Sequence, residues 1–253
     1  MSLQDRVVVV TGASSGIGAA IAVALGGRGA RLGLVARHGA RLEEVAARVR
    51  EAGGQALVLA TDITDRAAVR AMRERVVEEL GEVEVLVNNA GVSVWQYVVN
   101  CDQDSWDLMI DVNIRGVLNC LAAFLPSMVS RGRGDIVNMS SVRGREAGPG
   151  GAVYAGTKQF LEGLTASLRA EVAASGVKVT SVQPGLVDTP LVTGNLERGT
   201  DKRAVEDRAR AMEGMVTMLR PEQVAEAVVF VLLQPRDVSV PVLPVMAVSQ
   251  GFS

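Results

Sequence analysis

The sequence is poor in the residue types that build metal centres and disulfide frameworks. Among 253 residues it holds two cysteines, Cys101 and Cys120, and one histidine, His38. The cysteines match no metal-binding spacing and are too few for a disulfide framework, so we expect free thiols. A single histidine excludes a site with several histidine ligands. We therefore expect no metal ion.

An excess of charge of one sign is also lacking. Lysine and arginine total 26 against 28 acidic residues, a formal net charge of −2, so no basic field favours nucleic acid. No apolar run reaches transmembrane length, and the first residues, MSLQDRVVVV, lack the layout of a signal peptide. We expect a cytoplasmic protein without nucleic-acid or membrane partners. Only three cations are lysines, which with the many alanines and glycines suggests a GC-rich bacterial source.

Apolar sequence is abundant, and it comes in short blocks. Hydrophobic residues make up 48% of the chain, enough for a sizeable core. The blocks alternate with segments of helical periodicity, such as Leu42, Val45 and Val49 on one helix face. This alternation predicts a single α/β domain over residues 1–253, with a doubly wound, Rossmann-like parallel sheet and helices on both faces. The expected strands are residues 7–10, 31–36, 56–60, 85–88, 135–139 and 178–182.

Two segments fall outside the alternation. Residues 189–219 are polar and then rich in methionine. In a doubly wound fold, such an excursion after a late strand overhangs the carboxyl edge of the sheet, where ligands bind. We expect a substrate lid, with an ordinary pair of surface helices as the alternative. The tail 238–248 carries Pro241 and Pro244, which suits an edge strand at best.

The stretch VVVVTGASSGIGAAIAVAL runs from an apolar strand through three glycines into a helix. Glycine permits a tight turn and a close approach of the backbone to a ligand. The N-terminus of the helix offers unpaired N–H groups and a positive dipole end to a pyrophosphate. A glycine trio in this context predicts dinucleotide binding rather than a merely structural turn. The residues expected to bind are Gly12, Ser14, Ser15, Gly16, Ile17 and Gly18.

The end of the second expected strand bears on which dinucleotide binds. An acidic residue at this point holds the ribose hydroxyls of NAD in this architecture. Here Ala36 takes that place and Arg37 follows. No carboxylate repels a 2′-phosphate, and a guanidinium is present to bind one. We expect NADP(H) to be preferred over NAD(H). The alternative is that Arg37 is a solvated loop residue.

Tyr154 and Lys158 lie four residues apart, about one helical turn, so they share a helix face. An ammonium group beside a phenol favours the phenolate, which lowers a tyrosine pKa from its usual value of about 10. A lower pKa suits general acid–base catalysis near neutral pH. In isolation the motif would more often be a surface pair, so the other motifs must decide.

The motifs of this chain occur in an order that resembles the single-domain short-chain dehydrogenases/reductases. The resemblance rests on TGASSGIG at 11–18, NNAG at 88–91, Asn113 in DVNIRG, Ser141 in IVNMSSVRG, the Tyr154–Lys158 pair and PGLVDTP at 184–190. It covers about residues 5–235. It implies an oxidoreductase that transfers hydride between a nicotinamide and a ketone, an aldehyde or a secondary alcohol.

The resemblance also implies roles for single residues. Tyr154 exchanges a proton with the substrate oxygen, and Lys158 binds the nicotinamide ribose and lowers the tyrosine pKa. Ser141 holds the substrate oxygen, its neighbour Ser140 being less favoured. Asn113 supports a water that links Lys158 to solvent. The further cofactor contacts that it implies are Asp62, Ile63, Asn89, Ala90, Gly91, Pro184, Gly185, Val187 and Thr189.

A small-molecule substrate pocket is expected between residues 93–97, residues 142–153 and the lid. Its expected lining is Ser93, Val94, Trp95, Arg143 and Met215. The apolar side chains suit a ketone or alcohol of moderate size. Arg143 or Arg145 either pairs with a substrate carboxylate or points to solvent, as most charged side chains do.

The chain departs from the family pattern at its end, where VSVPVLPVMAVSQGFS replaces the usual glycine-rich tail. That puts the tetramer contact through this tail in doubt, so we expect a homodimer, or a homotetramer, built on the helices near 105–130 and 152–175. Two other functions compete with a reductase. An NAD-dependent epimerase or dehydratase is disfavoured by Ala36, and a non-catalytic NADP-binding regulatory protein is disfavoured by the intact catalytic residues.

Overall fold

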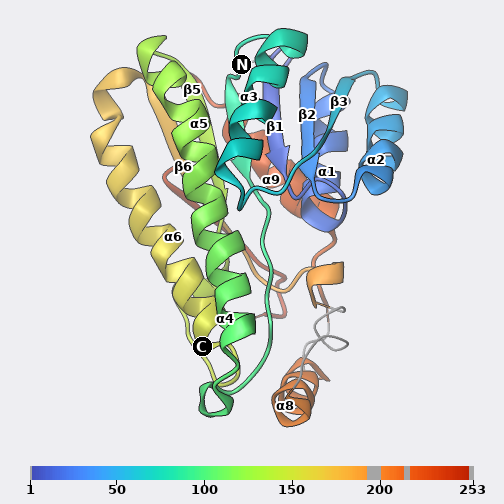
Figure 1. Cartoon of the computed structure of the whole chain (residues 1–253), viewed down its shortest axis with the longest axis vertical. Helices are drawn as coiled ribbons and strands as arrows, with labels where there is room; N and C mark the ends of the chain where they lie inside the picture. Colours follow the sequence, from blue (N-terminus) through green and yellow to red (C-terminus); the bar gives the residue numbers. More distant parts are fainter. Residues whose placement is uncertain (1, 193–200, 214–216, 251–253) are drawn as a thin grey trace.

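The computed structural model describes residues 2–192, 201–213 and 217–250. Within them, seven strands form one parallel sheet in the order β3-β2-β1-β4-β5-β6-β7 (Figure 1). The chain winds outward from β1 to β3 and then returns to place β4 on the other side of β1. The strands are β1 (Val7–Thr11), β2 (Arg31–Ala36), β3 (Gln55–Ala60), β4 (Val85–Asn88), β5 (Gly134–Met139), β6 (Val177–Pro184) and β7 (Val242–Val245).

The doubly wound sheet expected from the sequence is confirmed, and so are all six of its expected strands. β7 adds an edge strand beside β6 within the tail that the sequence allowed only as an edge. Pro244 lies in β7, in keeping with the restriction of proline to the edges of sheets.

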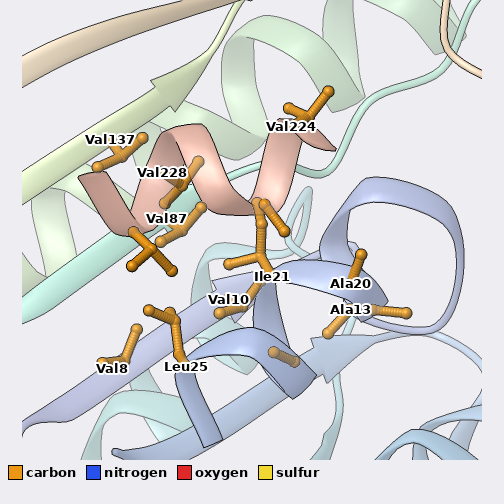
Figure 2. Close-up of a cluster of buried hydrophobic side chains, with 14 of the residues drawn as sticks. Val8, Val10, Ala13, Ala20, Ile21, Leu25, Val87, Val137, Val224 and Val228 are labelled. Carbon is orange, nitrogen blue, oxygen red and sulfur yellow. The ribbon is translucent and has the colours of Figure 1, made fainter. Parts of the chain in front are cut away.

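Helices cover both faces of the sheet because its strands are apolar on both sides. On one face lie α1 (Gly16–Gly26), α2 (Gly39–Glu51) and α9 (Pro221–Leu233); on the other lie α3 (Arg66–Leu80), α5 (Gly116–Ser130) and α6 (Ala152–Glu171). In β1, Val8 and Val10 point into the first layer, whereas Val7 and Val9 point into the second. Figure 2 shows the first core, a cluster that includes Val8 and Val10 of β1, Ile21 and Leu25 of α1, and Val224 and Val228 of α9.

The helical stretch expected near 105–130 is interrupted. It consists of α4 (Gln103–Ile110), a π-helical turn (Asp111–Arg115) and α5. Such turns insert an extra residue into a helix and are frequent at functional sites. This one carries Asn113, which is buried. The periodicity of the sequence gave no sign of the extra residue.

The same stretch, Gln103–Ser130, is long and apolar enough to cross a membrane by length and composition, contrary to the expectation from the sequence. Its most apolar window has a mean hydropathy of 1.6 and is 44% buried within the described fold. The inward side chains of α5, such as Leu121 and Phe124, belong to the core against the sheet. A core helix with a further apolar face meets the same criterion.

At the amino ends of the strands, Asp135 gathers a cluster of cations. This carboxylate is 2% exposed. It lies 2.5 Å from Arg6 Nη2, 3.3 Å from Lys178 Nζ and 3.5 Å from Arg236 Nη1. The cluster joins the starts of β5 and β6 to the segment before β1, on the edge of the sheet opposite to the site described next.

Candidate active site

The carboxyl ends of β1 to β6 open into a cleft of about 270 Å³. Residues that follow each of these strands line it, and α6 contributes Tyr154 and Lys158. This is the edge at which doubly wound sheets bind ligands, beside the point where the chain reverses between β1 and β4.

The glycine loop is shaped as a cradle. Gly12 has φ +66°, and a Cβ there would lie 2.8 Å from Ala90 Cα. A Cβ at Gly18 would lie 2.3 Å from the carbonyl oxygen of Gly12, so α1 begins tight against the loop. The Asn89 amide braces the loop by donating to Thr11 O at 2.9 Å. Among the described residues no side-chain cap covers the first turn of α1, whose start lines the cleft. The cradle therefore fits a pyrophosphate.

At the end of β2 the cleft is bordered by Ala36, Arg37 and His38. The Arg37 side chain is exposed, and no carboxylate of the described residues forms an ion pair with it. At the end of β3, Asp62 Oδ1 accepts 2.9 Å hydrogen bonds from the backbone N–H and the hydroxyl of Thr64. The Arg37 guanidinium is therefore available to bind an anion where the cleft meets the end of β2.

Asn113 ties three segments together beneath the cleft. Its Oδ1 accepts from the Val92 N–H at 2.8 Å, and its Nδ2 donates to Val92 O at 2.9 Å. The same Nδ2 donates to Thr157 Oγ1 at 3.1 Å, and the Thr157 hydroxyl donates to Tyr154 O at 2.7 Å. The π-helical turn is thereby linked to the segment after β4 and to the turn of α6 that carries Tyr154. Sequence reasoning missed Thr157, although it adjoins Lys158.

Tyr154 and Lys158 share one face of α6, as their spacing predicts. The Lys158 ammonium lies 5.7 Å from the centre of the Tyr154 ring and donates to Met139 O at 2.8 Å. Lys158 is 6% exposed. Burial lowers the pKa of Lys158 from 10.5 to about 8, and the Glu162 carboxylate opposes that shift. The cation is therefore close to its point of titration in the physiological range.

Ser141 begins a short helical turn (Val142–Gly144) after β5 and faces the cleft. Its Oγ accepts from the Arg143 N–H at 3.2 Å. Ser140 also lines the cleft, and its buried hydroxyl has no hydrogen-bond partner among the described residues. Two serine hydroxyls thus stand at the end of β5 and line the same cleft as Tyr154 and Lys158.

Trp95 and Arg143 pack against each other beside the start of α6. The guanidinium carbon lies 5.7 Å from the centre of the Trp95 ring. A Cβ at Gly150 or at Gly151 would lie 2.7 Å from the ring, so two glycines make room for the indole. Trp95 is buried and does not line the described cleft. The ring instead holds the loop that leads into Tyr154.

Within the expected lid, α8 (Lys202–Glu213) is attached to the segment after β4. Figure 1 shows α8 apart from the two helical layers. The Tyr97 hydroxyl donates to Asp207 Oδ2 at 2.6 Å, and the Tyr97 N–H donates to Asp201 Oδ2 at 3.1 Å. The Arg203 guanidinium carbon lies 5.7 Å from the centre of the Tyr97 ring. Tyr97 is thus the centre of a polar attachment for α8.

The structure brings most of the expected site residues to one cleft. Those that line it are Gly12, Ser14, Ser15, Gly16, Ile17, Arg37, Asp62, Ile63, Asn89, Ala90, Gly91, Ser141, Tyr154, Lys158, Pro184, Gly185, Val187 and Thr189. Gly18 and Asn113 are buried just behind it. Of the expected substrate residues, Ser93, Val94, Trp95 and Arg143 do not line the described cleft, and Met215 lies outside the described residues. Their roles stay predictions.

Sequence reasoning did not single out several lining residues. They are Val35, His38, Thr61, Val92, Val112 and Met139. Sequence reasoning did name Ala36, as standing in place of an acid, and Ser140, as the less favoured serine, and Pro190, Leu191 and Val192 fall within the expected lid. Most of those missed adjoin expected residues at strand ends, so extending each motif by one or two positions would have found them. Val112 belongs to the π-helical turn, which the sequence did not signal.

A doubly wound sheet with a glycine cradle and a buried tyrosine–lysine pair defines a nucleotide-binding oxidoreductase. The family model for short chain dehydrogenases matches residues 6–199. The chain belongs to this family, as the motifs indicated.

Relatives agree with this assignment. An uncharacterized oxidoreductase of Staphylococcus saprophyticus is 38% identical over 242 residues, which cover 95% of this chain and 96% of that protein. Glycine betaine reductase of Emericella nidulans is 40% identical over 237 residues; these cover 94% of this chain but 18% of that longer protein.

Solved structures are similar over nearly the whole chain. A closed serine dehydrogenase complexed with NADP+ has a TM-score of 0.86 and 30% identity and covers 98% of this chain and 97% of its own. An alcohol dehydrogenase of Thermococcus sibiricus complexed with 5-hydroxy-NADP has a TM-score of 0.84 and 32% identity, covering 98% and 99%.

Proposed function

We propose that this protein is an NADP(H)-dependent oxidoreductase that interconverts a ketone or aldehyde and an alcohol, working mainly as a carbonyl reductase. The observation that carries the proposal is the position of Tyr154 and Lys158 in the cleft that begins at the glycine cradle. When bound, the nicotinamide supplies or accepts the hydride.

The chain's own residues transfer the proton that the substrate oxygen gains or loses. Tyr154 gives a proton to, or takes one from, the substrate oxygen, which Ser141 Oγ holds by a hydrogen bond. The Lys158 cation, 5.7 Å from the tyrosine ring centre, favours the phenolate. Asn113 fixes the turn of α6 that carries Tyr154 through Thr157. The four residues work as one unit, so losing any of them is expected to impair turnover.

The preference for NADP(H) rests on the end of β2. Arg37 borders the cleft without an acidic neighbour at position 36, and its guanidinium suits a phosphate dianion. Two similar solved structures hold NADP+ or a hydroxylated NADP. The physiological direction, reduction, follows only from this cofactor preference.

The lid and the assembly are further parts of the proposal. The 189–219 segment would cover the substrate, with α8 attached at Tyr97. A homodimer or homotetramer would form on α5 and α6. Of the apolar side chains on these two helices, Leu121, Phe124 and Leu168 are buried in the core against the sheet, whereas Leu118 and Phe160 are 40% and 39% exposed.

Turnover of the reduced cofactor tests the proposed function. NADPH and NADH are run side by side against ketones, aldehydes, quinones and keto acids. We expect faster oxidation of NADPH, abolished in Tyr154→Phe. The comparison variant is Tyr97→Phe, at the other of the chain's two tyrosines, which should keep its kcat at saturating substrate. Unchanged turnover in Tyr154→Phe contradicts the proposal, and tight NADPH binding without turnover across the panel supports a regulatory protein instead.

A further inference from the structure

Glu162 lies one helical turn beyond Lys158 on the same face of α6. Its Oε1 accepts a hydrogen bond from the Ser181 hydroxyl of β6 at 2.6 Å. Helical side chains lean toward the N-terminus of the helix, so the Glu162 carboxylate leans over the turn that carries Lys158. The proton-transfer scheme above makes no use of this half-buried acid.

The surroundings leave Glu162 little freedom. A Cβ at Gly144 would lie 3.0 Å from Glu162 Cγ and 3.2 Å from the Lys158 carbonyl oxygen. Gly144 belongs to the short turn that Ser141 begins. The acid is therefore enclosed where α6, β6 and this turn meet, and the bond from Ser181 fixes its direction.

Lys158 has no carboxylate in direct contact among the described residues; its recorded hydrogen bond is to Met139 O. Several other charged or titratable side chains on the elements around it are engaged elsewhere. Arg143 stacks on Trp95, Asp111 and Arg115 of the π-helical turn pair with each other, Lys178 of β6 pairs with Asp135, and Tyr154 is the proposed proton donor. Among the described residues, Glu162 is the charge that acts on Lys158: it raises a pKa that burial lowers, and the two effects together give about 8.

We propose that Glu162 is a positioning residue for the reaction: its carboxylate, fixed by Ser181, keeps the buried Lys158 side chain charged at neutral pH. The inference rests on the proposed function because a charged Lys158 matters only if it assists Tyr154. Without Glu162, burial alone would act on the ammonium, and a larger fraction of Lys158 would be neutral near neutral pH.

The three lysines of the chain make a direct test practical. Protein labelled with ¹³C-lysine gives a side-chain NMR signal from Lys158, Lys178 and Lys202, and Lys158→Arg assigns the first. The signals are titrated in cofactor-free wild type, Glu162→Gln and Ser181→Ala. Glu171→Gln is the matched control, an exposed acid further along α6. The same variants are assayed for kcat/KM against pH.

In Glu162→Gln we expect the Lys158 midpoint to fall by about half a pH unit or more, with Lys178 and Lys202 unmoved. Ser181→Ala should shift it less, in the same direction, and Glu171→Gln should not shift it. The alkaline limb of kcat/KM should move down with the midpoint. An unmoved Lys158 midpoint overturns the inference.

If the Lys158 midpoint moves but the alkaline limb of kcat/KM does not, the positioning role of Glu162 is overturned, and the proposed oxidoreductase activity still stands. Loss of the proposed function itself would show differently, as absence of turnover in the wild type.

Discussion

Two lysines at opposite ends of the same sheet differ in the groups that hold their ammonium nitrogens. The Lys178 side chain at the amino end is 9% exposed and lies 3.3 Å from a carboxylate oxygen of Asp135. Lys158 at the carboxyl end is 6% exposed, and its ammonium is held by a backbone carbonyl. The paired lysine joins parts of the fold. A buried cation without a contact carboxylate is costly to keep, which supports the role proposed for Lys158 in the reaction.

The largest effect should come from removing the carboxyl-end cation. Lys158→Met is expected to lower kcat/KM by about 100-fold or more, because acid–base catalysis by Tyr154 loses its cation. Steady-state kinetics measures this, with Lys178→Met as the control that deletes the other ammonium and keeps turnover. A kcat/KM of Lys158→Met within about threefold of the wild-type value would contradict the role proposed for the Lys158 cation.

The same variant, Lys158→Met, should gain folding stability although it loses activity. The pKa of Lys158 is about 8 when folded against 10.5 for an unburied lysine. The charged lysine therefore destabilises the folded state below pH 8, and this cost fades as the pH rises from 8 to 10.5. Lys158→Met should be more stable than wild type by about 1–3 kcal/mol at pH 7. Urea unfolding at several pH values should show the gap closing toward pH 10.5; a constant gap contradicts this reading.

At the amino end of the sheet, Asp135→Asn should lower the free energy of unfolding and leave kcat unchanged. It leaves Arg6, Lys178 and Arg236 clustered without their shared carboxylate. We expect a loss of about 3–5 kcal/mol in the free energy of unfolding. The kcat of the folded fraction should stay near the wild-type value. Denaturant unfolding and kinetics on one preparation check both halves, and a loss below about 1 kcal/mol would mean that the cluster is not stabilising.

The sequence predicted which residues gather at the carboxyl end of the sheet because its signals there are local. Tyr154 and Lys158 follow from one helical turn, and the cradle follows from glycines at a strand–helix junction. The amino-end cluster could not be foreseen, since Asp135 meets Arg6 across 129 positions of sequence. The packing of Trp95 on Gly150 and Gly151 likewise depends on two loops that meet only in space.

A smaller effect is expected at the mouth of the cleft. Arg37→Ser should lower the preference for NADPH over NADH about tenfold, because a charged hydrogen bond to the 2′-phosphate is lost. The ratio of kcat/KM for the two cofactors measures it. Arg48→Ser, at an exposed position on α2, is the control. An unchanged ratio would make Arg37 a solvated loop residue.

The smallest effect concerns the lid. Tyr97→Phe removes the hydrogen bond to Asp207 but keeps the ring that faces Arg203. We expect the KM for substrate to rise about two- to fivefold with kcat nearly constant, because a looser α8 weakens binding and not chemistry. A fall in kcat with constant KM would place Tyr97 in the reaction itself.

The most direct test of the central claim, that the carboxyl end of the sheet is a site for NADP(H), needs no substrate. Thermal unfolding of the wild type is followed alone, with NADPH and with NADH at equal concentration. Ligand that binds the folded state raises the Tm according to its affinity. The account predicts a clear rise with NADPH and a smaller one with NADH. An unchanged Tm with both cofactors would contradict it.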